Sequence, residues 1–103
     1  MNGAERIAAE RKRQIEAEGF TASYDDENSH GEMALTATCY AMPVFRRYLT
    51  TWQQTFILDA HWYWDRKWWK PTPNNRIREL EKAGALIAAE IDRLLRLEVK
   101  QNG

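Results

Sequence analysis

The clearest pattern of hydrophobic positions lies near the C-terminus, between Arg76 and Val99. Apolar residues and one glycine recur there in steps of three and four: Ile77, Leu80, Gly84, Ile87, Ile91 and Leu94. This spacing predicts a long C-terminal helix. Pro73 prevents an earlier start, and Asn74 or Asn75 can cap the first turn.

Small residues form one narrow stretch of this predicted helix. They are Ala83, Gly84, Ala85, Ala88 and Ala89. Glycine lowers helix propensity, but a surface of small side chains lets another backbone come close. We therefore expect a tight contact with another helix, and the long helix with its small-residue stripe favours a homodimer or higher oligomer.

The first segment, residues 3–18, is rich in Ala, Glu, Arg and Gln and is followed by Gly19, a typical helix C-cap. This composition predicts a second helix. Its apolar residues are sparse: Ala4, Ile7, Ala8 and Ile15. We expect the helix to lie on the outside of a bundle and to bury one narrow stripe.

The segment "FTASYDDENS", residues 20–29, predicts a turn-rich connection. Ser29 and Glu32 fit a capping box, which would open a helix running through Met42 and ending at Pro43. The Ala, Thr, Leu and Tyr content of this helix indicates burial on most sides.

Residues 44–59 are ambiguous. Val44, Tyr48, Trp52 and Phe56 have helical spacing, whereas the Tyr, Thr, Trp, Phe and Ile content is typical of strands. We favour helix. No repeat or flexible linker divides the chain, so the sequence predicts one all-α domain over residues 1–103, a small bundle of three to four helices.

Composition limits the classes of function. Fifteen basic and fifteen acidic side chains balance, which argues against duplex nucleic acid as a partner. Cys39 is the only cysteine, so an intramolecular disulfide and a cysteine-based zinc site are excluded. No run approaches the roughly 18 apolar residues of a membrane span, and the N-terminus lacks an apolar signal segment. We expect a cytoplasmic protein that does not enter the membrane.

The segment "HWYWDRKWWK", residues 61–70, concentrates four of the five tryptophans beside basic residues. One interpretation is structural: Trp64 and Trp68, four residues apart, fill the core while Trp62 and Trp69 cover its edge. The other is a stacking platform beside cations that hold phosphate or carboxylate. The cations that could serve are Arg66, Lys67, Lys70, Arg76 and Arg78. The last two fall in the first turn of the C-terminal helix, where the dipole favours anions.

The segment "YDDENSHGE", residues 24–32, offers ligands for a magnesium or manganese ion. Its candidates are Asp25, Asp26, Glu27, His30 and Glu32. Acidic residues are also common in ordinary turns. Helical nucleotide pyrophosphohydrolases use carboxylates on neighbouring helices in this way, but their regular paired motifs are missing here. We therefore expect no bound metal or other cofactor.

Three blocks carry a family signal: "EGF" at 18–20 with the following Asp pair and "GEMA" at 31–34, "WDRKWWKP" at 64–71, and "KAGALIAAEI" at 82–91. Together they resemble a family of small phage and prophage accessory proteins, with residues 43–60 the least similar part. The resemblance implies a place in the host bacterial cytoplasm. For proteins of this size it also implies action against host defence.

The leading hypothesis is a non-catalytic protein that sequesters a nucleotide-derived immune signal of the cyclic nucleotide or ADP-ribose type. The expected ligand-binding residues are Trp64, Arg66, Trp68, Trp69, Lys70, Arg76 and Arg78. Two alternatives stay open. One is a metal-dependent nucleotide hydrolase using Asp25, Asp26 and Glu32. The other is a protein inhibitor of a host defence complex, with the tryptophan face as its anchor.

Overall fold

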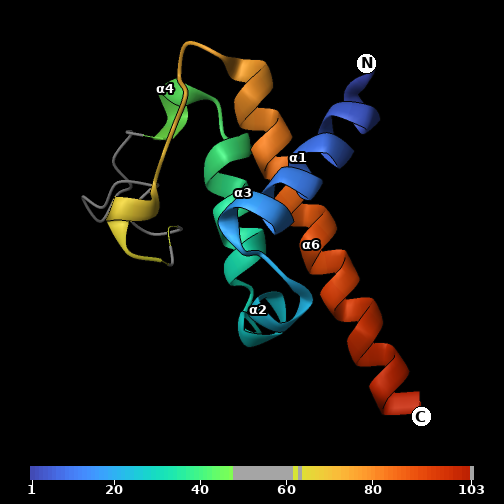
Figure 1. Ribbon diagram of the computed structural model, residues 1–103. Helices are drawn as coiled ribbons and strands as arrows, with labels where there is room; N and C mark the ends of the chain where they lie inside the picture. Colours follow the sequence, from blue (N-terminus) through green and yellow to red (C-terminus); the bar gives the residue numbers. More distant parts are fainter. Residues whose placement is uncertain (48–61, 63, 103) are drawn as a thin grey trace.

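The computed structural model describes residues 1–47, 62 and 64–102, and that part of the chain is helical with no β-strand. The elements are α1 (Gly3–Glu18), α2 (Ala22–Glu27), α3 (Glu32–Ala41), α4 (Val44–Arg47), a 3-10 turn η1 (Arg66–Trp68) and α6 (Arg76–Asn102) (Figure 1). The predicted all-α fold with a long C-terminal helix is confirmed. Residues 44–47 are helical as predicted, and the rest of the predicted 44–59 helix lies outside the described residues.

Helix α1 has the predicted bounds. Asn2 accepts a hydrogen bond from the Glu5 backbone N–H while the Glu5 carboxylate accepts one from the Asn2 N–H, which is a capping box. Gly19 ends the helix in the left-handed conformation with φ of 75°. The predicted apolar stripe is confirmed only at Ile7, which is half-buried against α6, because Ala4, Ala8 and Ile15 are exposed and the fully buried residues of α1 are Glu10 and Gln14.

The connection to α3 differs from the prediction in two places. It contains α2, whose first turn is capped by the Thr21 hydroxyl. The Ser29–Glu32 capping box is also wrong, since Gly31 occupies the N-cap of α3 at φ of 85° without a side-chain hydrogen bond. Glu32 instead accepts a hydrogen bond from the backbone N–H of His30. The helix ends just before Pro43, as predicted.

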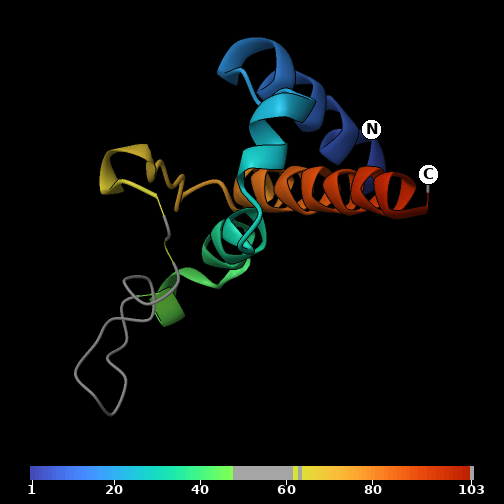
Figure 2. The same ribbon diagram turned by 90° about the horizontal axis from the view of Figure 1, so that it is seen from below.

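Helix α6 is the centre of the fold, with α1 on one side and α3 on the other (Figures 1 and 2). Asn75 caps it by accepting a hydrogen bond from the Arg78 N–H. The predicted close helix contact is confirmed, because Ala83, Ala85 and Ala89 are at most 3 % exposed. No helix in the described part of the chain has both the length and the apolar character needed to cross a membrane.

Gly84 marks the closest approach of α1 to α6. A Cβ atom at this position would lie 2.5 Å from Cδ1 and 2.7 Å from Cγ1 of Ile7. Both distances are shorter than real carbon contacts, so the Ile7 side chain occupies the space that any larger residue would need. The glycine therefore offsets its helix-propensity cost by admitting α1.

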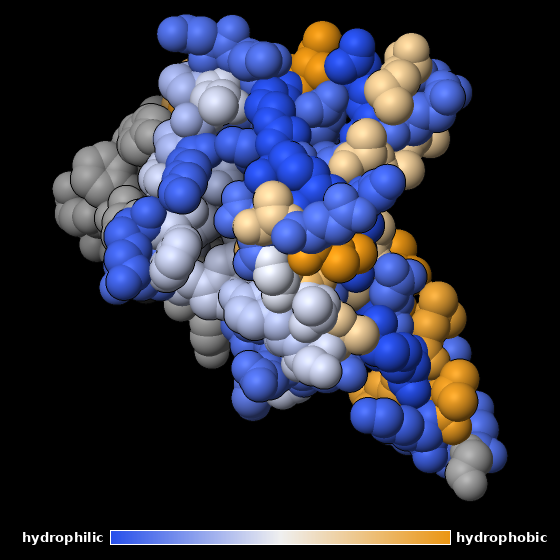
Figure 3. Space-filling view, viewed as in Figure 1, coloured by the Kyte–Doolittle hydropathy of each residue, from blue (hydrophilic) through white to orange (hydrophobic). Residues whose placement is uncertain are grey.

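The periodic aliphatic face of α6 is exposed rather than buried. Its large residues, Ile77, Leu80, Ile87, Ile91 and Leu94, are 44–58 % exposed. Figure 3 shows hydrophobic residues at the surface along the C-terminal turns of this helix. The small residues and Leu86, not these five large residues, are the apolar side chains that α6 buries.

A buried carboxylate joins the beginning of α6 to the end of α3. Glu79 is 0 % exposed and pairs with the equally buried Arg47 at 2.8 Å. Arg47 also donates hydrogen bonds to the carbonyl oxygens of Cys39 and Tyr40, which the end of α3 leaves without helical partners. Glu79 also accepts a hydrogen bond from the Thr72 backbone N–H at 3.2 Å and pairs with Arg76 at 3.4 Å. One ion pair therefore fixes α3, α4, α6 and the preceding loop together.

The charge of Glu79 is maintained against its surroundings. Burial alone would raise its pKa, but hydrogen bonding to Arg47 and the charge of that guanidinium outweigh burial, so the pKa lies below the ordinary value of 4.5. Glu79 is consequently ionised throughout the neutral range. Its ionisation adds to stability above pH 4.5, and this contribution is lost as the pH falls through the lowered pKa of the folded state.

Replacing Glu79 with glutamine should lower the free energy of unfolding at pH 7 by about 3 kcal/mol, because it leaves Arg47 buried without a counter-charge. The difference between the wild type and Glu79→Gln should shrink as the pH falls below 4.5, because the unfolded state takes up a proton on Glu79 before the native state does, until the lowered pKa of the native state is passed. Urea unfolding followed by circular dichroism between pH 3 and 7 measures both effects. Glu16→Gln, an exposed carboxylate 4.0 Å from Lys12, is the control and should change little. A pH-independent difference would contradict the assignment.

Gly84→Ala should destabilise the protein by about 1 kcal/mol, since the cost of overpacking against Ile7 exceeds the gain in helix propensity. In an Ile7→Ala background the same change should stabilise by about 1 kcal/mol, because only the propensity gain remains. Thermal unfolding of the four proteins in this cycle measures the reversal of sign. The same sign in both backgrounds would refute the close contact.

Candidate ligand-binding pocket

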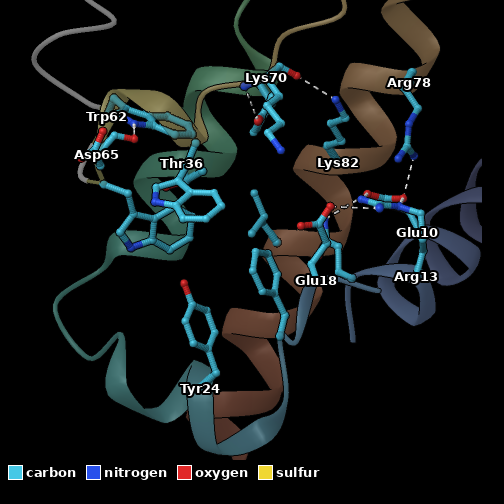
Figure 4. Close-up of a pocket in the computed structure, with 16 residues that line it drawn as sticks. Glu10, Arg13, Glu18, Tyr24, Thr36, Trp62, Asp65, Lys70, Arg78 and Lys82 are labelled. Carbon is cyan, nitrogen blue, oxygen red and sulfur yellow. Dashed lines mark hydrogen bonds and ion pairs between the residues drawn. The ribbon is translucent and has the colours of Figure 1, made fainter. Parts of the chain in front are cut away.

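A cavity of about 510 Å³ lies where α1, α3 and α6 meet the tryptophan segment (Figure 4). Aromatic side chains form one part of its wall: Phe20, Tyr24, Tyr40, Trp62, Trp64 and Trp68. Charged side chains form another: Glu10, Arg13, Glu18, Asp65, Lys70, Arg78 and Lys82. In Figure 4 the Trp62 indole lies across the cavity from Arg13 and Arg78. Its size is that of an ordinary small-molecule site.

The aromatic wall is fixed by hydrogen bonds at its polar edges. The Trp62 indole N–H donates to the Asp65 carbonyl oxygen at 3.1 Å, and the Trp64 indole N–H donates to Asn28 Oδ1 at 3.2 Å. The Trp62 and Trp64 rings meet edge to face with centroids 6.1 Å apart. Two indoles are thus held in place while Trp64 keeps part of its surface open to the cavity.

The tryptophans are not buried in the pattern that a helix would produce. Only Arg66–Trp68 form a helical turn here, of the 3-10 type. Trp62 is 9 % exposed, whereas Trp68 is 53 % exposed, so the prediction that Trp68 fills the core is wrong. Trp69 packs on Tyr40, with the two ring centroids 4.8 Å apart. The Arg47 guanidinium lies over the Trp69 ring.

A buried glutamate organises the arginines of the charged wall. Glu10 is 3 % exposed and lies 2.7 Å from Arg13 and 2.6 Å from Arg78. Burial opposes ionisation of Glu10, but the hydrogen bonds from these two guanidinium groups bring its pKa below the ordinary value. Arg78 also pairs with Glu81, at 3.2 Å. Carboxylates of the protein therefore already balance much of the arginine charge.

The two lysines of the wall differ from the arginines. Lys82 donates to the Lys70 carbonyl oxygen at 2.8 Å and lies 5.4 Å from the centre of the Tyr40 ring. The Lys70 ammonium lies 5.9 Å from the Trp68 ring centre. Neither lysine forms an ion pair with a carboxylate among the residues that the structure describes. Burial, aided by the nearby Arg78 charge, lowers the pKa of Lys82, and the more distant Glu10 and Glu79 charges offset this only in part.

The structure brings only part of the predicted ligand-binding set to this cavity. The residues in its wall are Trp64, Trp68, Lys70 and Arg78. Trp69 is not among the lining residues, and neither is Arg76, which donates to the carbonyl oxygens of Tyr40, Ala41 and Met42 and so caps the end of α3. The side chain of Arg66 lies outside the described part of the chain.

The predicted acidic ligands point to other partners. Asp25 is 0 % exposed and pairs with Arg11 at 3.1 Å, and burial raises its pKa. Asp26 pairs with Arg96 at 2.8 Å. Within the described residues no group of three or more His, Cys, Asp or Glu side chains is arranged to hold a metal ion.

Several pocket residues were not predicted. Lys82 and Leu86 lie four and eight residues after Arg78, so the helical period of α6 already places all three on one face. Phe20 and Tyr24 stack with ring centroids 5.1 Å apart. They are four residues apart, but because this segment was predicted to be a turn, they were not expected to lie on one side. Thr36 and Tyr40, also four residues apart, line the pocket from α3.

Comparison of the chain with models of protein families, with curated proteins and with solved structures gives no match. The resemblance to phage accessory proteins therefore stays a prediction. Function is inferred below from the shape and chemistry of the pocket.

Arg76→Ala should lower the free energy of unfolding by about 1 to 3 kcal/mol, because it leaves carbonyl groups at the end of α3 without donors. The exposed Arg46 of α4 provides a control, and Arg46→Ala should leave stability within about 0.5 kcal/mol. Chemical unfolding of both variants checks the difference. Equal stabilities would remove the capping role of Arg76.

Proposed function

We propose that the protein is a phage-encoded anti-defence protein of the bacterial cytoplasm that binds and sequesters a nucleotide-derived immune signal. The ligand class is a cyclic nucleotide or an ADP-ribose derivative, and no bond is made or broken. The observation that carries the proposal is one cavity of about 510 Å³ in which aromatic side chains face charged ones that include Arg13, Arg78 and Lys82. A nucleotide has the same division into a flat base and an anionic phosphate.

The aromatic wall suits the base. Trp64 is fixed through its N–H, so little conformational entropy is lost when a base stacks on it. Stacking on an aromatic side chain contributes about 1 to 3 kcal/mol per base and tolerates different bases. Trp68, which is 53 % exposed, can cover a bound base from the open side.

The lysines suit the phosphate. Arg13 and Arg78 already share the buried Glu10 carboxylate, so an incoming phosphate competes with that carboxylate for them. Lys82 is partly buried and has no carboxylate partner among the described residues, so an anion beside it would offset the cost of its burial. Lys82, which was not in the predicted set, is therefore the principal phosphate-binding residue of the proposal, and Arg76 has no part in it.

The two alternatives receive less support. A hydrolase would need Asp25, Asp26 and Glu32 to share an ion, but the first two pair with arginines and Glu32 accepts from the His30 N–H. An inhibitor of a host protein is favoured by one feature, the exposed indole of Trp68 flanked by Lys67 and Lys70. It becomes the leading alternative if no nucleotide binds.

The test is a depletion assay. The protein is incubated with magnesium and a panel of cyclic dinucleotides, cyclic ADP-ribose and ADP-ribose, and the free nucleotide is quantified by chromatography before and after heat denaturation of the protein. We expect depletion of one class that denaturation fully reverses. New products would instead establish hydrolysis, and the absence of depletion across the panel would refute nucleotide sequestration by this pocket.

Two matched variants locate the binding site. Lys82→Met keeps the aliphatic stem but removes the charge, and it should weaken nucleotide binding at least tenfold, which is about 1.4 kcal/mol. Lys12→Met removes a lysine of α1 that is 75 % exposed and lies outside the cavity wall, and it should leave affinity unchanged. Equal affinities for the two variants would contradict the proposed position of the phosphate. Unchanged circular dichroism spectra would show that both variants keep the helical fold.

A further inference from the structure

The charged side chains of the pocket nearly balance one another. Four of them are cations and three are carboxylates, so at neutral pH their formal charges leave one positive charge in excess. The seven are Arg13, Lys70, Arg78, Lys82, Glu10, Glu18 and Asp65. The contacts of each group decide where in the pocket that excess lies.

The buried carboxylate of Glu10 already has a full set of donors. Its Oε1 atom lies 2.7 Å from Arg13 Nε and 2.6 Å from Arg78 Nη1. Its Oε2 atom lies 3.0 Å from Arg13 Nη2 and 3.2 Å from Gln14 Nε2. A ligand anion that bound either arginine would take donors from a carboxylate that is only 3 % exposed. Separating a buried charge from its partners is strongly destabilising.

Each of the two arginines also has a second carboxylate. Arg13 pairs with Glu18 at 3.0 Å, and Arg78 pairs with Glu81 at 3.2 Å. A phosphate placed beside these guanidinium groups would therefore lie close to several negative charges that repel it. The arginine side of the pocket offers hydrogen-bond donors but little net positive charge.

Lys82 is the cation that differs. It is half-buried, and its one hydrogen bond within the described part of the chain goes to the Lys70 carbonyl oxygen at 2.8 Å (Figure 4). An ammonium group has three N–H donors, so Lys82 has donors left for a ligand. The Lys70 side chain is exposed, and water and salt screen its charge. The pocket thus contains one half-buried cation without a carboxylate partner among the described residues.

The aromatic side of the pocket is a single continuous surface. Phe20 stacks on Tyr24 with ring centroids 5.1 Å apart and meets Trp64 at 6.4 Å, and Trp64 meets Trp62 at 6.1 Å. The Trp62 indole lies across the cavity from Arg13 in Figure 4. A ligand with one base can stack on this surface and direct its phosphate toward the charged side chains.

The charge of the phosphate group separates the candidate nucleotides. A cyclic dinucleotide has two phosphodiesters, and ADP-ribose and its cyclic form have a diphosphate, so each carries two negative charges. A cyclic mononucleotide has one base and one phosphodiester, which carries one. A second charge would have to take Arg13 or Arg78 from Glu10, whereas a single charge needs only Lys82.

We infer that the ligand of this pocket is a 3′,5′-cyclic mononucleotide, whose single phosphodiester charge pairs with Lys82 while its base stacks on the aromatic surface. This inference rests on the proposed function, because it selects one ligand within the proposed nucleotide class. Glu10 is then a specificity-determining residue, since by holding both arginines it excludes ligands with a second charge.

Isothermal titration calorimetry at pH 8 tests the inference with the 3′,5′-cyclic monophosphates of adenosine, guanosine, cytidine and uridine. The one that binds most tightly is compared with its own 5′-monophosphate, which has the same base and sugar. The 5′-monophosphate carries nearly two charges at this pH, because its second pKa is about 6. The wild type should bind the cyclic form at least tenfold more tightly.

Three variants test the role of Glu10. Glu10→Gln should strengthen binding of the 5′-monophosphate at least tenfold, because both arginines keep a second carboxylate but no longer hold a buried charge. Glu18→Gln changes an exposed carboxylate of the same wall and should act in the same direction by about threefold, even if Glu10→Gln does not fold. Glu16→Gln, which is 63 % exposed and lies outside the wall, is the control and should leave both affinities unchanged.

The possible failures of this test are distinct. Equal or tighter binding of the 5′-monophosphate by the wild type would overturn the inference, and so would an affinity ratio that neither glutamate variant changes. Depletion of ADP-ribose or of a cyclic dinucleotide, with no binding of the four cyclic mononucleotides, would overturn the ligand assignment and leave sequestration intact. The absence of binding by every nucleotide would refute both.

Discussion

The buried ion pair between Glu79 and Arg47 is the interaction on which the arrangement of the helices depends. It satisfies the carbonyl groups at the end of α3, orients the loop before α6, and anchors α4 beside the aromatic cluster through Trp69. A buried charge pair adds little net stability by itself, but it strongly disfavours any packing that separates its partners. The pair thus specifies one arrangement of helices that share few large apolar contacts.

Helix α6 carries different chemistry on different sides. Small residues bring α1 and α3 close, another side holds Arg78 and Lys82 in the pocket wall, and large aliphatic residues such as Ile87 stay exposed. This division lets one helix of a 103-residue chain serve both the core and the cavity. The core is correspondingly small and rich in polar groups. Its buried carboxylates, Glu10 and Glu79, form ion pairs with arginines instead of being replaced by aliphatic side chains.

The sequence was sufficient for the helices and insufficient for much of the site. Periodicity and capping residues predicted α1 and α6 because both signals are local. The role of Arg76 could not be predicted, since the α3 carbonyl groups that it caps are brought near only by tertiary packing. Lys82 was missed for a related reason, because a lysine in a helix indicates solvent exposure until the neighbouring walls are known. Trp64, Trp68 and Lys70 of the tryptophan segment and Arg78 of α6 do line the pocket as expected, whereas Trp69 of the same segment does not.

The division of α6 into sides also limits how its length can change. A helix turns by about 100° per residue, so one residue inserted after Glu79 would rotate everything beyond it by that angle. Lys82 and Leu86 would leave the pocket wall, and the small alanines would no longer meet α1 and α3. Substitutions at single positions disturb one surface, whereas a change of register disturbs all of them together. The spacing between Glu79 and Leu94 is therefore more tightly constrained than most of the side chains within it.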